Sequence, residues 1–215
     1  MCFGICAVSP LTAGPPPDRN NPTYSQALFM HRDPQEYLAE AESKMDVPSG
    51  IPGRRSPHTV GLAAKAALEA GALDKAAKYA TEAIETAILV EAKLRRTDPG
   101  RFNLRRGIPE GYFFGNFVLG RIAVLNGDIR GAEKYLLASG NIGGGTALSS
   151  YGPNLSLALE LLKNGDDQSR ETVIRFIQEI RTFWKIAPTH FDTWIAAIES
   201  GKIPDFQATG SNLYN

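Results

Sequence analysis

Three glycines that each interrupt a helical pattern constrain the fold of this chain most. Gly71, Gly127 and Gly165 each stand between two segments whose apolar residues recur with a period near 3.6. A glycine placed directly after a helix, where the chain reverses, favours a positive φ and ends that helix. Over comparable lengths the sequence shows no alternation with the period of two that strands require. The pattern therefore predicts an all-α fold built from antiparallel helix hairpins.

The three hairpins are predicted over residues 59–92, 111–140 and 152–184. In each, an apolar helix precedes the glycine, and a second helix rich in small and apolar residues follows it. Small residues allow paired helices to approach closely. The close approaches are expected at Ala76, Ala80, Ala83 and Ala132.

Two of the turns carry a longer motif. The stretch GALDKAAKYATEAI runs from Gly71 to Ile84, and GDIRGAEKYLLA runs from Gly127 to Ala138. Both resemble the second half of a tetratricopeptide repeat, and the pair Leu119-Gly120 resembles the Leu-Gly pair of its first helix. The resemblance covers roughly residues 57–184. It implies an α-α superhelix of stacked antiparallel hairpins with capping helices, in which the first helix of each hairpin lines a concave groove.

The repeats are degenerate. Val60 and Asn116 stand where the repeat usually has an aromatic residue early in its first helix, and the terminal prolines are absent. The distance from Gly71 to Gly127 exceeds one repeat of about 34 residues. Residues 97–110 are therefore expected either to loop out or to extend the helix before them.

The sequence divides into four parts. Residues 1–23 are predicted to be a disordered N-terminus or a signal remnant, 24–56 an N-terminal helix with a Pro/Gly-rich linker, 57–200 the helical array, and 201–215 a C-terminal tail. Helices are expected at 34–45 and at 193–200. Repeat arrays need atypical end units that cover apolar surface. That role is expected of Phe183, Trp184, Phe191 and Trp194.

Composition narrows the classes of partner and compartment. Lys+Arg and Asp+Glu both number 23, so no net charge attracts nucleic acid, and no apolar run reaches the roughly 18 residues of a membrane span. Both cysteines, Cys2 and Cys6, lie at the N-terminus, which excludes a disulfide framework in the body. The apolar run at residues 2–8 and the prolines at 15–17 resemble the end of a secretory signal that lacks its basic start. A disordered start explains them equally well, so the compartment stays open.

The sequence offers little support for catalysis. His31, His58 and His190 are dispersed, so neither a metal site nor another cofactor is expected. The glycine-rich stretch 140–146 lacks the lysine of a phosphate loop. It is expected to be a flexible connector between hairpins, with an anion-binding nest of backbone N–H groups as the alternative. The Asn-Leu-Ser stretch at 154–156 is expected to be a helix cap rather than a glycan acceptor.

Five arginines surround Phe102 in the stretch 95–106. Guanidinium groups bind carboxylates and phosphates through paired N–H contacts, so Arg101, Arg105 and Arg106 are candidate ligands of an anion. The alternative is a solvated loop, or a loop paired with the acidic segment 33–46.

The proposed groove supplies a second candidate surface. Aromatic side chains flanked by lysine and arginine suit an extended peptide with an acidic group. Mapping the repeat onto the first helices places there His58, Lys65, Phe114, Phe117, Arg121, Leu155 and Lys163. Phe114 and Phe117 have an alternative role, which is packing beneath neighbouring segments.

Together these features predict a non-enzymatic scaffold that binds a peptide or partner protein through its groove. Nucleic acid is not expected as a partner, and an oligomer is compatible with the sequence. The alternatives are a structural component that assembles through apolar end surfaces and an anion-binding enzyme that uses the 140–146 loop.

Overall fold

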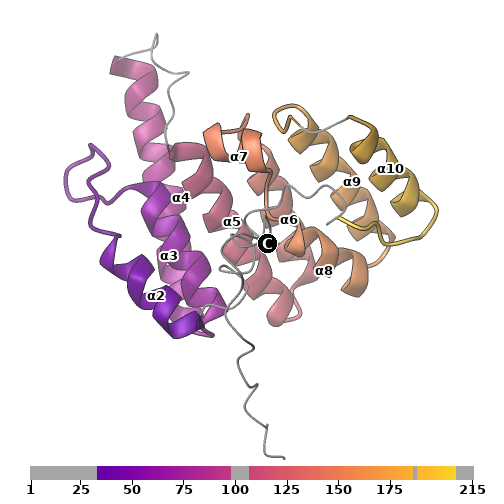
Figure 1. Ribbon diagram of the computed structural model, residues 1–215, viewed down its shortest axis with the longest axis horizontal. Helices are drawn as coiled ribbons and strands as arrows, with labels where there is room; N and C mark the ends of the chain where they lie inside the picture. The colour runs from indigo at the N-terminus through magenta and orange to yellow at the C-terminus, as the bar shows by residue number, and fades with distance from the viewer. Residues whose placement is uncertain (1–32, 98–106, 186–187, 207–215) are drawn as a thin grey trace, which may run out of the picture. The chain divides into compact units, whose positions relative to one another are not determined.

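The computed structural model describes residues 33–97, 107–185 and 188–206 (Figure 1). Within these ranges the chain forms nine helices and no strand, which confirms the predicted all-α fold. Contacts group Pro34–Asn215 as one unit, apart from Met1–Asp33, and the description below concerns the larger unit. Its helices are α2 (Pro34–Ser43), α3 (Pro57–Glu69), α4 (Leu73–Thr97), α5 (Ile108–Leu125), α6 (Ile129–Gly140), α7 (Thr146–Tyr151), α8 (Ser156–Asn164), α9 (Asp167–Arg181) and α10 (Pro188–Glu199).

Each predicted hairpin is present as two helices in contact. These pairs are α3 with α4, α5 with α6, and α8 with α9. The first helices also contact one another, because α3 packs on α5 and α5 packs on α8. Helix α2 packs on α3, and α10 packs on α9, so both ends of the series carry an additional helix (Figure 1).

The glycine turns follow two different physical rules. Gly71 and Gly127 have φ angles of 72° and 75°, as predicted for residues that end a helix in the left-handed region. The same prediction is wrong for Gly165, whose φ is −95°. There the requirement is space, because a Cβ atom would lie 2.0 Å from Oγ of Ser169. The turn is instead closed by Asp166, whose carboxylate accepts a hydrogen bond from the Ser169 amide at 3.2 Å.

Small residues bring the helices together, as the sequence predicts. A Cβ atom added to Gly111 of α5 would lie 2.4 Å from the backbone of Pro57 in α3. A Cβ added to Gly120 would lie 2.4 Å from the Leu157 side chain of α8. The predicted alanines are fully buried, namely Ala76, Ala80, Ala83 and Ala132.

Helix α4 runs without interruption to Thr97, and α5 begins at Ile108. Residues 98–106, which make up most of the segment predicted either to loop out or to extend the helix, lie outside the described residues. The predicted N-terminal helix is confirmed as α2, which is tied to α4 by Glu42. The Glu42 carboxylate accepts from Nζ of Lys75 and from the Tyr79 hydroxyl, each at 2.8 Å. The Lys75 hydrogen bond, followed by that of Tyr79, lowers the pKa of Glu42.

Aromatic residues cover the C-terminal end, as predicted. The Trp184 ring lies 5.8 Å from Phe191 and 5.9 Å from Trp194, measured between ring centroids. Phe206 adds a further edge contact at 5.2 Å from Trp194, and the Trp194 indole donates to the Asp205 carbonyl at 3.2 Å. The α9–α10 end is therefore closed by packed rings.

Candidate functional site

The predicted groove residues lie on the three first helices. Lys65 is on α3, Arg121 on α5 and Lys163 on α8. Lys163 is exposed, whereas the Lys65 side chain is 13% exposed and pairs with Glu69 at 2.8 Å. Its ammonium also lies 5.8 Å from the centre of the Tyr37 ring. Lys65 is therefore already engaged within the fold.

Arg121 joins two first helices. Its Nε and Nη2 atoms donate to the two carboxylate oxygens of Glu160 on α8, at 3.1 Å and 2.5 Å. The guanidinium carbon lies 5.9 Å from the centre of the Phe117 ring. The Arg121 side chain is 32% exposed and that of Glu160 is 26% exposed, so the pair borders solvent. A planar guanidinium held in this way is oriented before any ligand arrives.

Phe114 and Phe117 are core residues. Their exposures are 0% and 2%, and Phe113 contacts both rings, edge-on to Phe114 and stacked on Phe117. Of the two roles left open for these residues, the structure shows packing, and in this arrangement they offer no surface to a peptide. The remaining candidates Arg101, Arg105 and Arg106 lie outside the described residues.

The glycine-rich stretch connects helices, as expected, because residues 141–145 are non-helical and lie between α6 and α7. The short helix α7, which begins at Thr146, was not expected from the sequence. Oε1 of Glu110, in the first turn of α5, accepts a hydrogen bond from the Ala147 amide at 3.1 Å. The Glu110 carboxylate therefore lies beside Gly145, next to the stretch in which the anion-nest alternative was placed. A negative charge at this point does not favour a second anion beside it.

Glu110, which sequence reasoning missed, lies near His58, one of the predicted groove residues. Glu110 is 4% exposed, and its Oε2 has no hydrogen-bond partner; Nδ1 of His58, at the start of α3, is also buried without a partner. Burial lowers the pKa of His58, and the nearby Glu110 charge opposes this effect to a smaller extent. The histidine is therefore held mainly in its neutral form.

A second group of charges joins α6 to α9. Glu133 is 4% exposed and accepts from Ser169 at 2.6 Å and from Gln168 at 3.1 Å. Arg130 bridges Glu133 and Asp166, and its guanidinium lowers the pKa of Asp166. A cavity of about 200 Å³ lies beside these residues and is also lined by Lys134, Glu171 and Arg175. Because carboxylates and basic groups alternate around it, its chemistry favours no single ligand charge.

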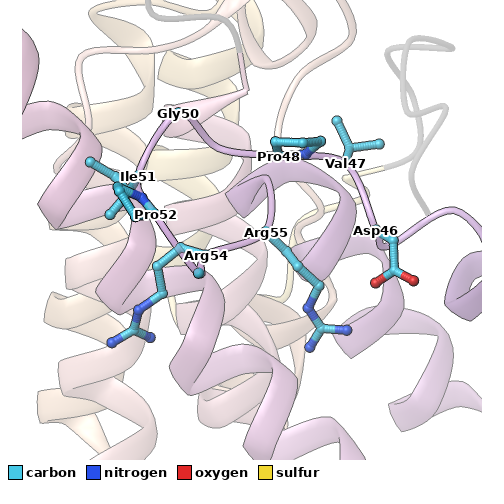
Figure 2. A pocket seen from close by; sticks show the side chains of 9 residues that line it. Asp46, Val47, Pro48, Gly50, Ile51, Pro52, Arg54 and Arg55 are labelled. Carbon is cyan, nitrogen blue, oxygen red and sulfur yellow. The ribbon is translucent and has the colours of Figure 1, made fainter.

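The loop between α2 and α3 encloses an open hollow of about 450 Å³ (Figure 2). Its lining runs from Asp46 to Arg55, and Arg54 and Arg55 project to the same side of the loop. These arginines pair with Glu85 and Glu82 of α4 at 3.2 Å and 2.6 Å. These two ion pairs fix the loop on α4, so both arginines have a structural role.

The Asn-Leu-Ser stretch lies at the start of α8, where the sequence predicts a cap, but the N-cap residue is Leu155, which makes no side-chain cap hydrogen bond. Asn154 is 5% exposed, and its side-chain oxygen accepts from the Ser156 amide at 2.8 Å. In the ranges that the structure describes, no three His, Cys, Asp or Glu side chains gather as metal ligands. Nor does any helix of these ranges have the length and apolarity needed to cross a membrane.

Comparison with known proteins adds no relative. No protein-family model, curated protein or solved structure matches this chain.

Proposed function

We propose that this protein is a non-enzymatic scaffold of the tetratricopeptide kind, which binds an acidic segment of a partner protein on the face formed by α3, α5 and α8. The order of helix contacts supports the repeat arrangement: each first helix packs on the next, and each is paired with the helix that follows its turn. Stacking of hairpins in this order produces an extended surface on which partners bind.

The partly exposed Arg121 guanidinium, oriented by Glu160, is the observation that carries this proposal. Its described contacts engage Nε and Nη2 and leave Nη1 for a ligand. A second carboxylate approaching from solvent would meet a group already oriented by Glu160 and by the Phe117 ring. Lys163, exposed one helical turn after Glu160 on α8, adds a second positive charge. An acidic peptide lying across α5 and α8 satisfies both groups.

The test uses synthetic peptides, so that no natural partner has to be known. Fluorescent decapeptides with alternating acidic and apolar residues are titrated against the full chain, with lysine-substituted versions as the charge control. Arg121→Gln and Lys163→Glu are each expected to weaken binding about tenfold, since a hydrogen bond to a charged group contributes about 1.5–3 kcal/mol. Lys134→Glu, at an exposed position of α6, is the matched control and should bind as the wild type does.

Two results would remove the proposal. One is equal affinity of the wild type and both groove variants, and the other is equal binding of acidic and basic peptides. Affinity capture from the native cell, comparing wild type with Lys163→Glu, then identifies which natural segment uses the face.

Assembly with other copies is a second candidate, favoured by the exposed end of α4. Ile88 and Leu89 are 52% and 43% exposed there, on consecutive residues of one helix. Light scattering across a concentration series should show a dimer that Ile88→Asp abolishes and that Leu125→Asp, at an exposed turn, leaves intact. A wild-type monomer at every concentration excludes this candidate.

A further inference from the structure

The segment Gly143–Tyr151, which contains α7, lies between glycines with unusual backbone angles. Gly143 and Gly144 have φ angles of 65° and 79°, and Gly152, directly after the segment, has 83°. Other residues rarely adopt these angles, so glycine is favoured at both ends of the segment. Gly143 has open space around it, whereas Gly144 packs against Phe183 and Gly152 against Trp184. Among the helices described, α7 contacts only α5. We call this segment the α7 strap.

A hydrogen bond joins the strap to α5. Oε1 of Glu110 accepts from the Ala147 amide at 3.1 Å. Glycine is required opposite this carboxylate, because a Cβ atom on Gly145 would lie 2.5 Å from Oε1 and 2.8 Å from Oε2. The buried carboxylate is only partly satisfied by this bond, since its second oxygen, Oε2, has no donor. A buried acceptor without a donor is unfavourable, so the closed state of the strap leaves one unsatisfied group.

The strap meets α5 on the helix face that also carries Arg121, the group proposed to bind partners, and we call this face the α5 stripe. Glu110, Phe117 and Arg121 are spaced by seven and four residues, which places them on one face of a helix. Exposure changes along this stripe: Glu110 is 4% exposed, whereas the Arg121 side chain is 32% exposed. Along this stripe Glu110 and Phe117 are buried and Arg121 is partly exposed, and the strap lies against the buried end at Glu110.

We propose that the α7 strap is a releasable cover, latched by Glu110, that hides the N-terminal half of the α5 binding stripe. This inference rests on the proposed function for its biological meaning. Release requires rotation at Gly143, Gly144 and Gly152 and separation of the Ala147 amide from Glu110. Other contacts limit the movement, because Leu148 is fully buried and the Lys185 amide donates to the Ser149 carbonyl at 3.2 Å.

Two variants open the latch by independent routes. Glu110→Ala removes the acceptor. Gly145→Ala keeps Glu110 but places a methyl group against its carboxylate; Gly145 has φ −148°, which alanine adopts without strain. Glu110→Gln retains an acceptor oxygen and should stay closed. Ser150→Ala, at an exposed position of α7, is the matched control.

Hydrogen–deuterium exchange of the full chain measures the opening without any ligand. Amides of residues 145–152 are expected to exchange about tenfold faster in Glu110→Ala and Gly145→Ala, because a hydrogen bond to a charged group is lost. Amides of α3 and α9 should keep wild-type rates, which separates local release from general destabilisation. Equal exchange of the strap in Gly145→Ala and wild type, or an equal increase in every helix, would overturn the latch.

Binding measurements test the cover separately. The apolar dye bis-ANS should fluoresce more with both opened variants than with Glu110→Gln, since release uncovers α5. Unchanged dye binding despite faster exchange overturns the covering role. The acidic decapeptides should bind the opened variants more tightly than the wild type. If no peptide binds any variant, the proposed function fails, while exchange and dye binding still decide the latch.

Discussion

Replacing Gly111 by alanine should destabilise the protein, although the same change usually stabilises a helix. Alanine is favoured over glycine by about 1 kcal/mol in helix interiors. At Gly111, however, the new Cβ would lie 2.4 Å from both the carbonyl carbon and the oxygen of Pro57. Those are backbone atoms at the start of α3, so no side-chain rotation relieves the contact.

The magnitude follows from the distance. Carbon atoms in contact prefer about 3.5–4.0 Å, so α3 and α5 must separate by roughly 1 Å at this point. A gap of that size forfeits a quarter to a half of each dispersion contact along the seam, and overpacking of a core typically costs about 1–3 kcal/mol. After the gain in helix propensity, a net loss of about 0–2 kcal/mol remains, and a value near 2 kcal/mol is expected because the contacts are with backbone atoms. For a chain of this length that corresponds to a decrease in Tm of about 5 °C.

Thermal unfolding followed by circular dichroism measures this difference. Gly61→Ala is the graded comparison, since its Cβ would lie 3.1 Å from Cβ of Phe114 and 3.2 Å from Cα of Gly111, and its effect should be smaller. Thr81→Ala, on the exposed side of α4, tests helix propensity alone and should leave Tm unchanged or slightly higher. A Tm of Gly111→Ala at or above the wild-type value would refute the close α3–α5 seam.

Two further predictions concern buried polar groups. Because burial lowers the pKa of His58 in the folded protein, the unfolded chain takes up a proton more readily, and the free energy of unfolding should fall as the pH drops below about 6.5. Urea unfolding between pH 8 and pH 5 should show a shallower decline in His58→Gln, and an unchanged decline would contradict the burial. Ser169→Ala removes a donor from the buried Glu133 carboxylate and should lower the free energy of unfolding by about 1.5 kcal/mol, measured by urea denaturation at neutral pH. Glu133→Ala removes the acceptor of both the Ser169 hydroxyl and the Gln168 amide, while Arg130 keeps its pair with Asp166, and should lower the free energy of unfolding by more than Ser169→Ala does. Equal losses for the two variants would show that the carboxylate is not the centre of the network.

The helical elements were largely predictable because their signal is local. Apolar periodicity over ten or more residues identified the hairpins and the N-terminal helix, and the glycines marked their turns. Gly165 shows the limit of that signal. A glycine is selected either for a positive φ or for lack of space, and the sequence is the same in both cases. Only the position of Ser169, four residues later in the folded turn, distinguishes the two.

The candidate site was predictable only in part because its chemistry depends on distant pairs. Arg121 was chosen as a free cation, yet its partner Glu160 lies 39 residues away and on another hairpin. Glu110 was overlooked because a glutamate in a first helical turn is commonly an exposed group that complements the helix dipole. Its burial depends on the backbone of Ala147, 37 residues further along the chain. Neither Glu160 nor Ala147 can be recognised as a partner from the residues next to Arg121 or Glu110 in the sequence.

The composition of α5 nevertheless indicates its burial, although the periodicity of its apolar residues does not. A helix that is apolar on all sides is expected to be buried, and α5 carries only two charged residues, Glu110 and Arg121. Reading one amphipathic face into it led to Phe114 and Phe117 being assigned to a surface. On a helix of this kind the charged residues are the exceptions that need a partner. Both have one, since Glu110 holds the α7 strap and Arg121 holds α8. Glu110 and Arg121, the two charged residues of α5, therefore mark the two ends of the proposed binding stripe.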